Sequence, residues 1–165
     1  MSAPLPPLAS QCDNSDKPVQ HVQPRVAVVG AGVIGLLVAL HIKQTLNDVQ
    51  VVVIADKFFQ ETTSYVAGGL WEPHLLSNTP PLDINRWSSY AYNYYKNLFV
   101  SDQAGRAGVA RLFVQNIFTK EEPRPTWADI PHSFVNLDKC QLKQLGLPSK
   151  YTHGFQFISY VAEPR

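Results

Sequence analysis

Three glycines spaced as Gly-x-Gly-x-x-Gly, at Gly30, Gly32 and Gly35, are the first residues whose spacing indicates chemistry. They follow a β-branched run that ends at Val29 and precede a stretch, 33–46, whose apolar residues have helical spacing. In such a motif the first glycine permits a tight turn, the second lets backbone amides approach a pyrophosphate, and the third lets the helix pack closely on the strands. The helix N-terminus adds unpaired N–H groups and partial positive charge. The sequence therefore predicts a dinucleotide-binding turn.

An acidic residue stands where a dinucleotide site needs one. Val49 to Ala55 is a second apolar run, predicted to be a buried strand, and Asp56 closes it about 20 residues after Gly35. A carboxylate there can accept hydrogen bonds from both ribose hydroxyls, and it disfavours the 2′-phosphate of NADP. For Asp56 alone, a solvated carboxylate at a strand end is an equally good interpretation. The order of strand, motif, helix, strand and acid favours a βαβ dinucleotide unit.

Three adjacent hydroxyls, on Thr62, Thr63 and Ser64, follow this unit, and small residues continue to Gly69. Hydroxyls and a closely approaching backbone suit a second pyrophosphate contact and a planar ring laid against the chain, which favours FAD over NAD. An N-cap role for Thr62 or Thr63 at a helix start is the alternative, and it is compatible with cofactor binding. An NAD-dependent dehydrogenase remains an open alternative at this point.

The remaining residues predict a mixed architecture. We expect a loop over 76–83, then a helix over 85–100 with an apolar stripe of Trp87, Ala91, Tyr94 and Leu98. Further along we expect strands over 109–118 and 153–162 and a short capped helix over 138–145.

The predicted fold class is therefore α/β, a Rossmann-like FAD-binding unit followed by part of an α+β substrate domain. The expected division is a disordered extension over 1–24, the βαβ unit and flavin-contacting loop over 25–80, and the start of a substrate domain over 81–165. Because a partial second domain leaves sheet edges and apolar faces uncovered, we expect the chain to be an incomplete fragment of a longer protein.

Composition narrows the possible partners. The formal net charge is +1, so we expect no nucleic-acid partner, which a gathered basic excess would indicate. The five histidines have no ligand spacing, and Cys12 and Cys140 lie far apart, so we expect no metal site. Residues 26–42 carry no fixed charge, but the three glycines break this short stretch, so we expect no membrane span.

The sequence resembles the family of D-amino-acid oxidases and D-aspartate oxidases. The stretches that carry the resemblance are Val26 to Leu36, Ala55 to Phe58 and Thr62 to Pro73, and the specific part is Val66-Ala67-Gly68-Gly69-Leu70-Trp71 directly after the hydroxyl run. Weaker similarity extends it to about residues 25–165. The resemblance implies an FAD flavoprotein that oxidises D-amino acids and passes electrons to molecular oxygen, giving hydrogen peroxide, ammonia and a 2-oxo acid.

The resemblance also implies roles for individual residues. Ala31, Gly32, Val33 and Ile34 would meet the pyrophosphate, in the turn that Gly30 and Gly35 shape. Asp56 would bind the adenosine ribose, with Lys57 near the adenine. Thr62, Thr63 and Ser64 would contact the phosphates and ribityl chain. Gly68, Gly69 and Leu70 would line one flavin face with backbone amides near the reactive nitrogen, where such amides can stabilise the negative charge of the reduced flavin.

Three residues depart from the family pattern. Tyr65 replaces an aspartate, Gly68 an alanine, and Glu72 stands where the amino-acid oxidases have glutamine. Glu72 would add negative charge near the substrate entrance, whereas His74 and the Ala-Gly pairs over 104–108 are closer to the D-aspartate oxidase branch. Whether the substrate is a neutral or an acidic D-amino acid therefore stays open.

The family's catalytic residues would lie beyond Arg165, so the sequence leaves the catalytic residues unknown. The resemblance further implies a peroxisomal enzyme and allows a homodimer. A truncated, non-catalytic product is the alternative from another functional class.

Overall fold

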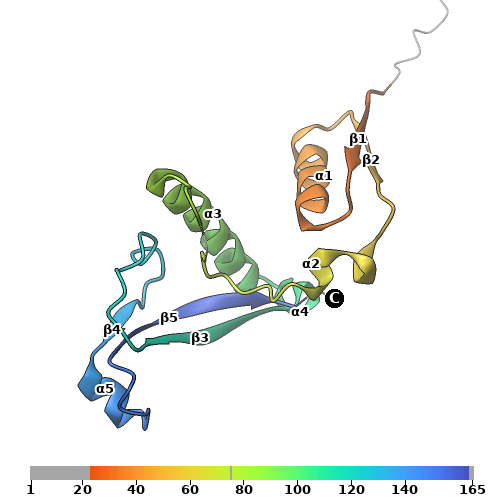
Figure 1. The fold of residues 1–165 in the computed structure, drawn as a ribbon. Helices are drawn as coiled ribbons and strands as arrows, with labels where there is room; N and C mark the ends of the chain where they lie inside the picture. The colour runs from red at the N-terminus through yellow and green to blue at the C-terminus, as the bar shows by residue number, and fades with distance from the viewer. Residues whose placement is uncertain (1–22, 75, 164–165) are drawn as a thin grey trace, which may run out of the picture.

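The computed structural model describes residues 23–74 and 76–163 as a mixed α/β chain, whose first part is a parallel βαβ unit (Figure 1). This unit consists of β1 (Arg25–Val29), α1 (Val33–Thr45) and β2 (Gln50–Ile54). The two strands pair in parallel, with Arg25 opposite Gln50 and Val29 opposite Ile54. The predicted strands and helix are confirmed, each within one residue of its expected bounds. The predicted extension lies outside the described residues, except for Gln23 and Pro24.

One face of the β1–β2 pair is covered by α1. Val26 and Val28 are half-buried while their neighbours in β1 are exposed, as a strand covered on one face requires. In α1 the small side chain of Ala39 is buried, which lets the helix lie close to the strands. Among the described residues, no helix combines the length and apolar character that crossing a bilayer requires.

A connecting stretch leads from β2 to the second part of the molecule. It contains a turn of 3-10 helix, η1 (Phe59–Glu61), and the short helix α2 (Thr63–Val66). It then becomes extended, and Leu70 forms an antiparallel bridge with Val161. The stretch that follows the hydroxyl run is therefore held against the second sheet.

The second part is built on a three-stranded antiparallel sheet in the order β3-β5-β4. These strands are β3 (Val109–Phe118), β4 (Val135–Leu137) and β5 (His153–Ala162). The two long strands are confirmed with the predicted bounds, while β4 and the short helix α4 (Ala104–Ala107) were not predicted. The capped helix is also confirmed as α5 (Lys139–Gln144): Asp138 forms a capping box with Gln141.

The long helix α3 corrects two sequence predictions. It spans Pro81–Phe99, so its first turn lies inside the stretch 76–83 that was predicted to be loop, because proline is compatible with the first helical position. Its predicted apolar stripe is correct for Ala91, which packs against the core, but wrong for Trp87 and Tyr94. Trp87 and Tyr94 are 57% and 43% exposed, and the buried residues are Ile84, Ser88 and Tyr92. Aromatic residues occur around much of this helix, so spacing alone does not identify the covered face.

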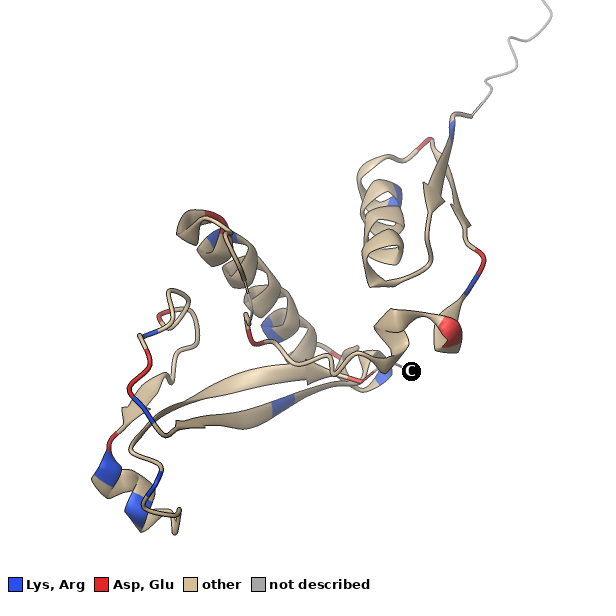
Figure 2. Cartoon of the chain, viewed as in Figure 1, with Lys and Arg blue, Asp and Glu red and all other residues tan. Residues whose placement is uncertain are grey.

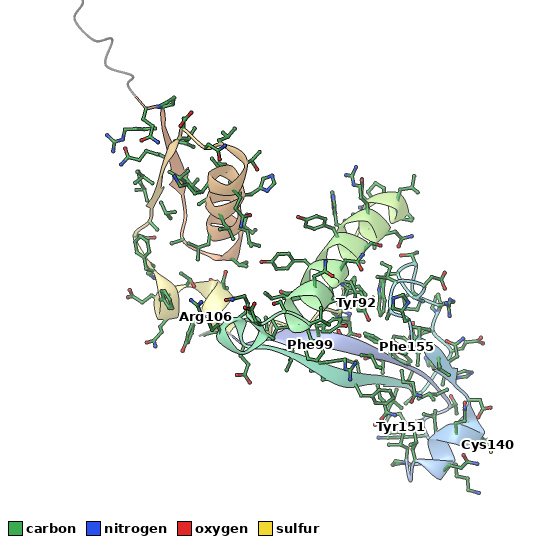
Figure 3. The ribbon with its side chains drawn as sticks, turned by 180° about the vertical axis from the view of Figure 1, so that it is seen from behind. Tyr92, Phe99, Arg106, Cys140, Tyr151 and Phe155 are labelled. Atoms are coloured by element: carbon green, nitrogen blue, oxygen red, sulfur yellow. The ribbon has the colours of Figure 1, made fainter. Side chains whose placement is uncertain are left out.

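The core lies where α3, β5 and the connecting stretch meet. Trp71 stands edge-on to Tyr92 of α3, with ring centroids 4.8 Å apart, and edge-on to Trp127 at 5.6 Å. Phe157 of β5 packs 5.2 Å from Trp127 and is fully buried. Figure 3 shows Tyr92 on α3 and Phe155 farther along the sheet. Burial raises the pKa of the Tyr92 phenol, and the neighbouring Tyr160 adds to this effect.

Removing the Phe157 ring tests how far this aromatic core stabilises the protein. We expect Phe157→Ala to lower the free energy of unfolding by about 3–5 kcal/mol, because it leaves a cavity among Trp71, Trp127 and Phe134. Phe113→Ala is the matched control, since that side chain on β3 is 54% exposed. Urea unfolding followed by tryptophan fluorescence measures both variants. Equal losses of stability in the two would contradict the placement of the core.

Candidate functional site

The glycine turn brings the end of β1 directly to the start of α1. Gly30 has φ of +108°, a conformation that L side chains rarely adopt, and its N–H donates to the Ile54 carbonyl at 2.8 Å. A Cβ at Gly35 would overlap the Gly30 carbonyl oxygen. Both glycines therefore have the mechanical roles that the motif predicts: one makes the turn and the other permits close packing of the helix.

The N-terminus of α1 lacks a capping side chain of its own, because its N-cap residue is Gly32. Instead, the N–H of Val33 donates to the Ser64 hydroxyl at 2.9 Å, from 31 residues away in the sequence. A Cβ at Gly32 would lie 3.1 Å from the same hydroxyl oxygen. Ser64 and the glycine turn are thus in direct contact, and the first turn of α1 presents backbone N–H groups there.

Asp56 lies two residues beyond β2 and is exposed, as is Lys57. Because β1 and β2 are parallel, their carboxyl ends meet at the same edge of the sheet. The glycine turn leaves from that edge, and Asp56 follows the neighbouring strand at the same edge. This is the position from which a carboxylate reaches the sugar of a nucleotide whose phosphates lie at the helix N-terminus.

The hydroxyl run borders a cavity of about 560 Å³ between α1, the connecting stretch and the end of β5. The residues predicted for the cofactor site that line it are Ala31, Val33, Thr62, Thr63, Ser64 and Gly69. The others lie outside its lining: Gly30, Gly32, Ile34, Gly35, Asp56, Lys57, Gly68 and Leu70. The structure therefore gathers the three hydroxyls, the start of α1 and Gly69 around one cavity.

The other residues of this cavity were not predicted as site residues from the sequence: Leu36, Leu37, Leu40, Phe59, Tyr65, Ala67, Tyr95, Ala162 and Glu163. Burial raises the pKa of the Tyr95 phenol, and Tyr94 adds to the shift, so Tyr95 presents a neutral wall at neutral pH. The two-residue period of 153–162 predicts a strand, but it does not tell which partner lies beside its end. The contact of Ala162 with Gly69 is therefore visible only in the structure.

The hydroxyl run does not cap α2 in the way that the sequence alternative proposes. Thr62 is the N-cap residue of α2, but its hydroxyl donates to the Phe59 carbonyl at 2.8 Å and no side-chain cap forms. Thr63 is already the first helical residue, which places it past the N-cap position. Of the three hydroxyls, that of Ser64 is the one directed to α1.

Glu72, one of the three departures from the family pattern, is half-buried and accepts a hydrogen bond from the Asn116 side chain of β3 at 2.5 Å. The salt bridges found among the described residues join Arg86 to Asp83 and Arg124 to Asp129, so none neutralises Glu72. The Glu72 carboxylate is thus held by an amide rather than by a cation.

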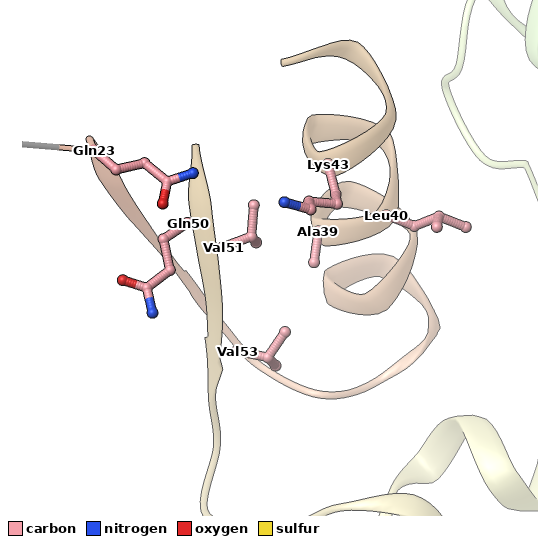
Figure 4. Close-up of a pocket in the computed structure, with 7 residues that line it drawn as sticks. All are labelled: Gln23, Ala39, Leu40, Lys43, Gln50, Val51 and Val53. Atoms are coloured by element: carbon pink, nitrogen blue, oxygen red, sulfur yellow. The ribbon is translucent and has the colours of Figure 1, made fainter. Parts of the chain in front are cut away.

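A second, open pocket lies on α1 and β2, away from the glycine turn (Figure 4). Its lining is mostly aliphatic, with Ala39, Leu40 and the stem of Lys43 facing Val51 and Val53. The Lys43 amine donates to the Val49 carbonyl at 3.4 Å. The pocket contains none of the predicted site residues, so we place the candidate site at the cavity beside Ser64.

The sequence of this chain is similar to those of a known protein family and of several characterised proteins. A family model described as "DAO: FAD dependent oxidoreductase" matches residues 25–154. The chain is 36% identical over 141 residues to human D-aspartate oxidase, covering 84% of this chain and 40% of that protein. It is 29% identical over 146 residues to a Dictyostelium discoideum D-amino-acid oxidase, covering 86% of this chain and 39% of that protein. The chain thus spans about two fifths of the length of these relatives.

Two adjacent glycines give opposite predictions. Gly69 has φ of +60°, and a Cβ there would overlap the Ala162 carbonyl, so we expect Gly69→Ala to lower the free energy of unfolding by about 2 kcal/mol. A Cβ at Gly68 would meet nothing within 4 Å, so Gly68→Ala should raise stability by about 0.5 kcal/mol through the unfolded chain. Thermal unfolding followed by circular dichroism compares them. A stable Gly69→Ala variant would show that this backbone contact is absent in solution.

Proposed function

Because this chain belongs to the DAO family of FAD-dependent oxidoreductases, we propose that it forms the FAD-binding part of an oxidase of D-amino acids. One observation carries the proposal. The helix start at the glycine turn lies in contact with the hydroxyl run, and Asp56 follows the neighbouring parallel strand at the same edge. This arrangement supplies groups for the phosphates and for the ribose of one dinucleotide, in the manner of a Rossmann unit.

The backbone of this site fits a diphosphate. Residues 30–35 carry no charged side chain, and the first turn of α1 contains no acidic residue. Lys and Arg residues are spread over both parts of the molecule (Figure 2). The attraction for phosphate therefore comes from backbone N–H groups and the helix dipole, which need the close approach that Gly32 permits. Ala31, Val33 and Ile34 would present these amides.

Further along, Asp56 would accept hydrogen bonds from the ribose hydroxyls, with Lys57 beside the adenine. Thr63 would donate to phosphate or ribityl oxygens from the rim of the cavity. Thr62, whose hydroxyl hydrogen is donated to the Phe59 carbonyl, would accept from a ribityl hydroxyl. Gly68, Gly69 and Leu70 would support the flavin ring, where the strand-like pairing of Leu70 with Val161 keeps the backbone fixed. The bound FAD supplies the hydride acceptor for oxidation of the substrate Cα. The residues of this chain would bind the FAD and orient it for the reaction.

The proposed reaction converts a D-amino acid, molecular oxygen and water into a 2-oxo acid, ammonia and hydrogen peroxide. Purified protein that carries a flavin absorption spectrum, and that forms peroxide from D- but not L-amino acids, would support it. A protein that binds NADH and not FAD would overturn it. Peroxisomal location and a homodimer stay predictions.

D-Aspartate is the second candidate substrate, because the human relative that shares 36% identity is named for it. We favour a neutral D-amino acid on the basis of Glu72. In an extended segment, side chains two residues apart point to the same face, so Glu72 follows Leu70 on the flavin side of the connecting stretch. Among the described residues no cation pairs with this half-buried carboxylate, so it would repel the second carboxylate of D-aspartate.

Removing the Asp56 carboxylate tests the cofactor site. We expect Asp56→Ala to weaken FAD binding by about 10-fold to 100-fold, the effect of losing hydrogen bonds to a charged group. Asp48→Ala is the control, because Asp48 is an exposed carboxylate in the turn before β2, at the opposite end of that strand. Titration by flavin fluorescence quenching measures both. Unchanged affinity in Asp56→Ala would place the ribose elsewhere.

Substituting Glu72 tests the substrate class. We expect Glu72→Gln to raise kcat/KM for D-aspartate relative to D-alanine by about tenfold, because it removes a like charge while keeping an oxygen that can accept from Asn116. Glu61→Gln, on the exposed residue at the end of η1, is the control. Peroxide formation with each amino acid gives the ratio. If the ratio is the same in both variants, Glu72 does not face the substrate.

A further inference from the structure

The hydroxyl of Ser64 joins two segments that the sequence places far apart. It accepts the N–H of Val33 at 2.9 Å, which satisfies one of the first-turn donors of α1 that a glycine N-cap leaves without a side-chain partner. Ser64 is half-buried beside the cavity, and its hydroxyl oxygen would lie only 3.1 Å from a Cβ at Gly32. The contact is therefore close, and it lies at the glycine turn itself.

The same segment is fixed at its other end by the second sheet. The N–H of Ala162 donates to the Gly69 carbonyl at 3.1 Å, and the N–H of Trp71 donates to the Tyr160 carbonyl at 2.9 Å. The Trp71 carbonyl also accepts a hydrogen bond from the buried Ser159 hydroxyl. We refer to residues 64–71 as the tether. It is bonded to α1 at one end and to β5 at the other.

We propose that Ser64 is a positioning residue that couples the phosphate end of the bound cofactor to its flavin end. The inference rests on the proposed function, in which phosphates lie at α1 and the flavin lies along Gly68 to Leu70. Only residues 65–67 separate Ser64 from that flavin-contacting stretch. Loss of the bond between Ser64 and α1 would therefore free the end of the tether that leads into the backbone beside the flavin.

The chemistry of a hydroxyl allows both contacts at once. A serine hydroxyl has one donor hydrogen and two acceptor lone pairs, and Val33 uses one lone pair. The hydrogen can then be donated to a phosphate oxygen without breaking the bond to α1. In this way a bound phosphate strengthens the attachment of the tether, since a hydrogen bond to an ionised acceptor is stronger than a neutral one. A serine that only contacted phosphate would not have this effect on the flavin.

The first experiment uses the FAD-free protein. We expect Ser64→Ala to speed amide hydrogen exchange at Val33 by about tenfold, and Ser64→Thr to keep it near the wild-type rate because the hydroxyl is retained. Thr45→Ala is the control, since its hydroxyl lies at the other end of α1 and bonds locally to the His41 carbonyl. Unchanged exchange at Val33 in Ser64→Ala would overturn the tether.

The second experiment compares FAD with ADP, which has the phosphates but no flavin. We expect Ser64→Ala to weaken FAD binding several-fold more than ADP binding, and to change the visible circular dichroism of the bound flavin. Ser64→Thr should restore both. Equal weakening of the two nucleotides with an unchanged flavin spectrum would reduce Ser64 to a phosphate ligand and overturn the coupling. Wild-type protein that binds neither nucleotide would overturn the proposed function, while exchange at Val33 still decides whether the tether exists.

Discussion

The start of α1 can face a ligand only because no side chain stands between it and the end of β1. A Cβ at Gly35 would overlap the Gly30 carbonyl, so any other residue there would push the helix away from the strand. Gly30 itself continues the β pairing into the turn through its bond to Ile54. As a consequence, the first-turn N–H groups open at the edge where both parallel strands end, and Asp56 follows the neighbouring strand at that edge. Ser64 of the hydroxyl run bonds to this helix start, and both border the cavity.

The second sheet holds the other end of the site, and β5 is the strand on which that depends. It pairs with β3 along one edge and with β4 along part of its length, and Leu70 bridges to Val161 near its end. Its residues Phe157 and Ser159 are fully buried, and Ser159 bonds to the Trp71 carbonyl. The backbone of Gly69 to Trp71 therefore takes its place from a strand almost 90 residues later in the sequence. Such non-local pairing has to await the closure of a long loop.

This difference between local and non-local order decides what the sequence could predict. The β1 turn, both long strands and the capped helix at Asp138 depend on neighbouring residues, and their predictions are confirmed. The prediction of the covered face of α3 was wrong for Trp87 and Tyr94, because aromatic residues occur around much of that helix and only tertiary contact selects Tyr92 for burial. The bond from Val33 to Ser64 was not predicted for the same reason: the motif and the hydroxyl run are each visible, but their contact is not.

The chemistry offered by the described residues is mainly that of backbone amides, carbonyls and hydroxyls. The tyrosines with shifted pKa values, Tyr92 and Tyr95, are both shifted upward by burial, which moves them further from use as bases at neutral pH. In the proposed oxidase such a site would act by placing reacting groups, and the rate of hydride transfer depends steeply on alignment: a misplacement of about 1 Å can cost about 100-fold in rate. Under the proposed function, the attachment of Gly69 and Leu70 to β5 would therefore serve alignment of the flavin as well as the fold. Phe157 and Trp71 pack against each other outside the cavity lining, so in the proposed oxidase their burial would act on the reaction through the position of that backbone.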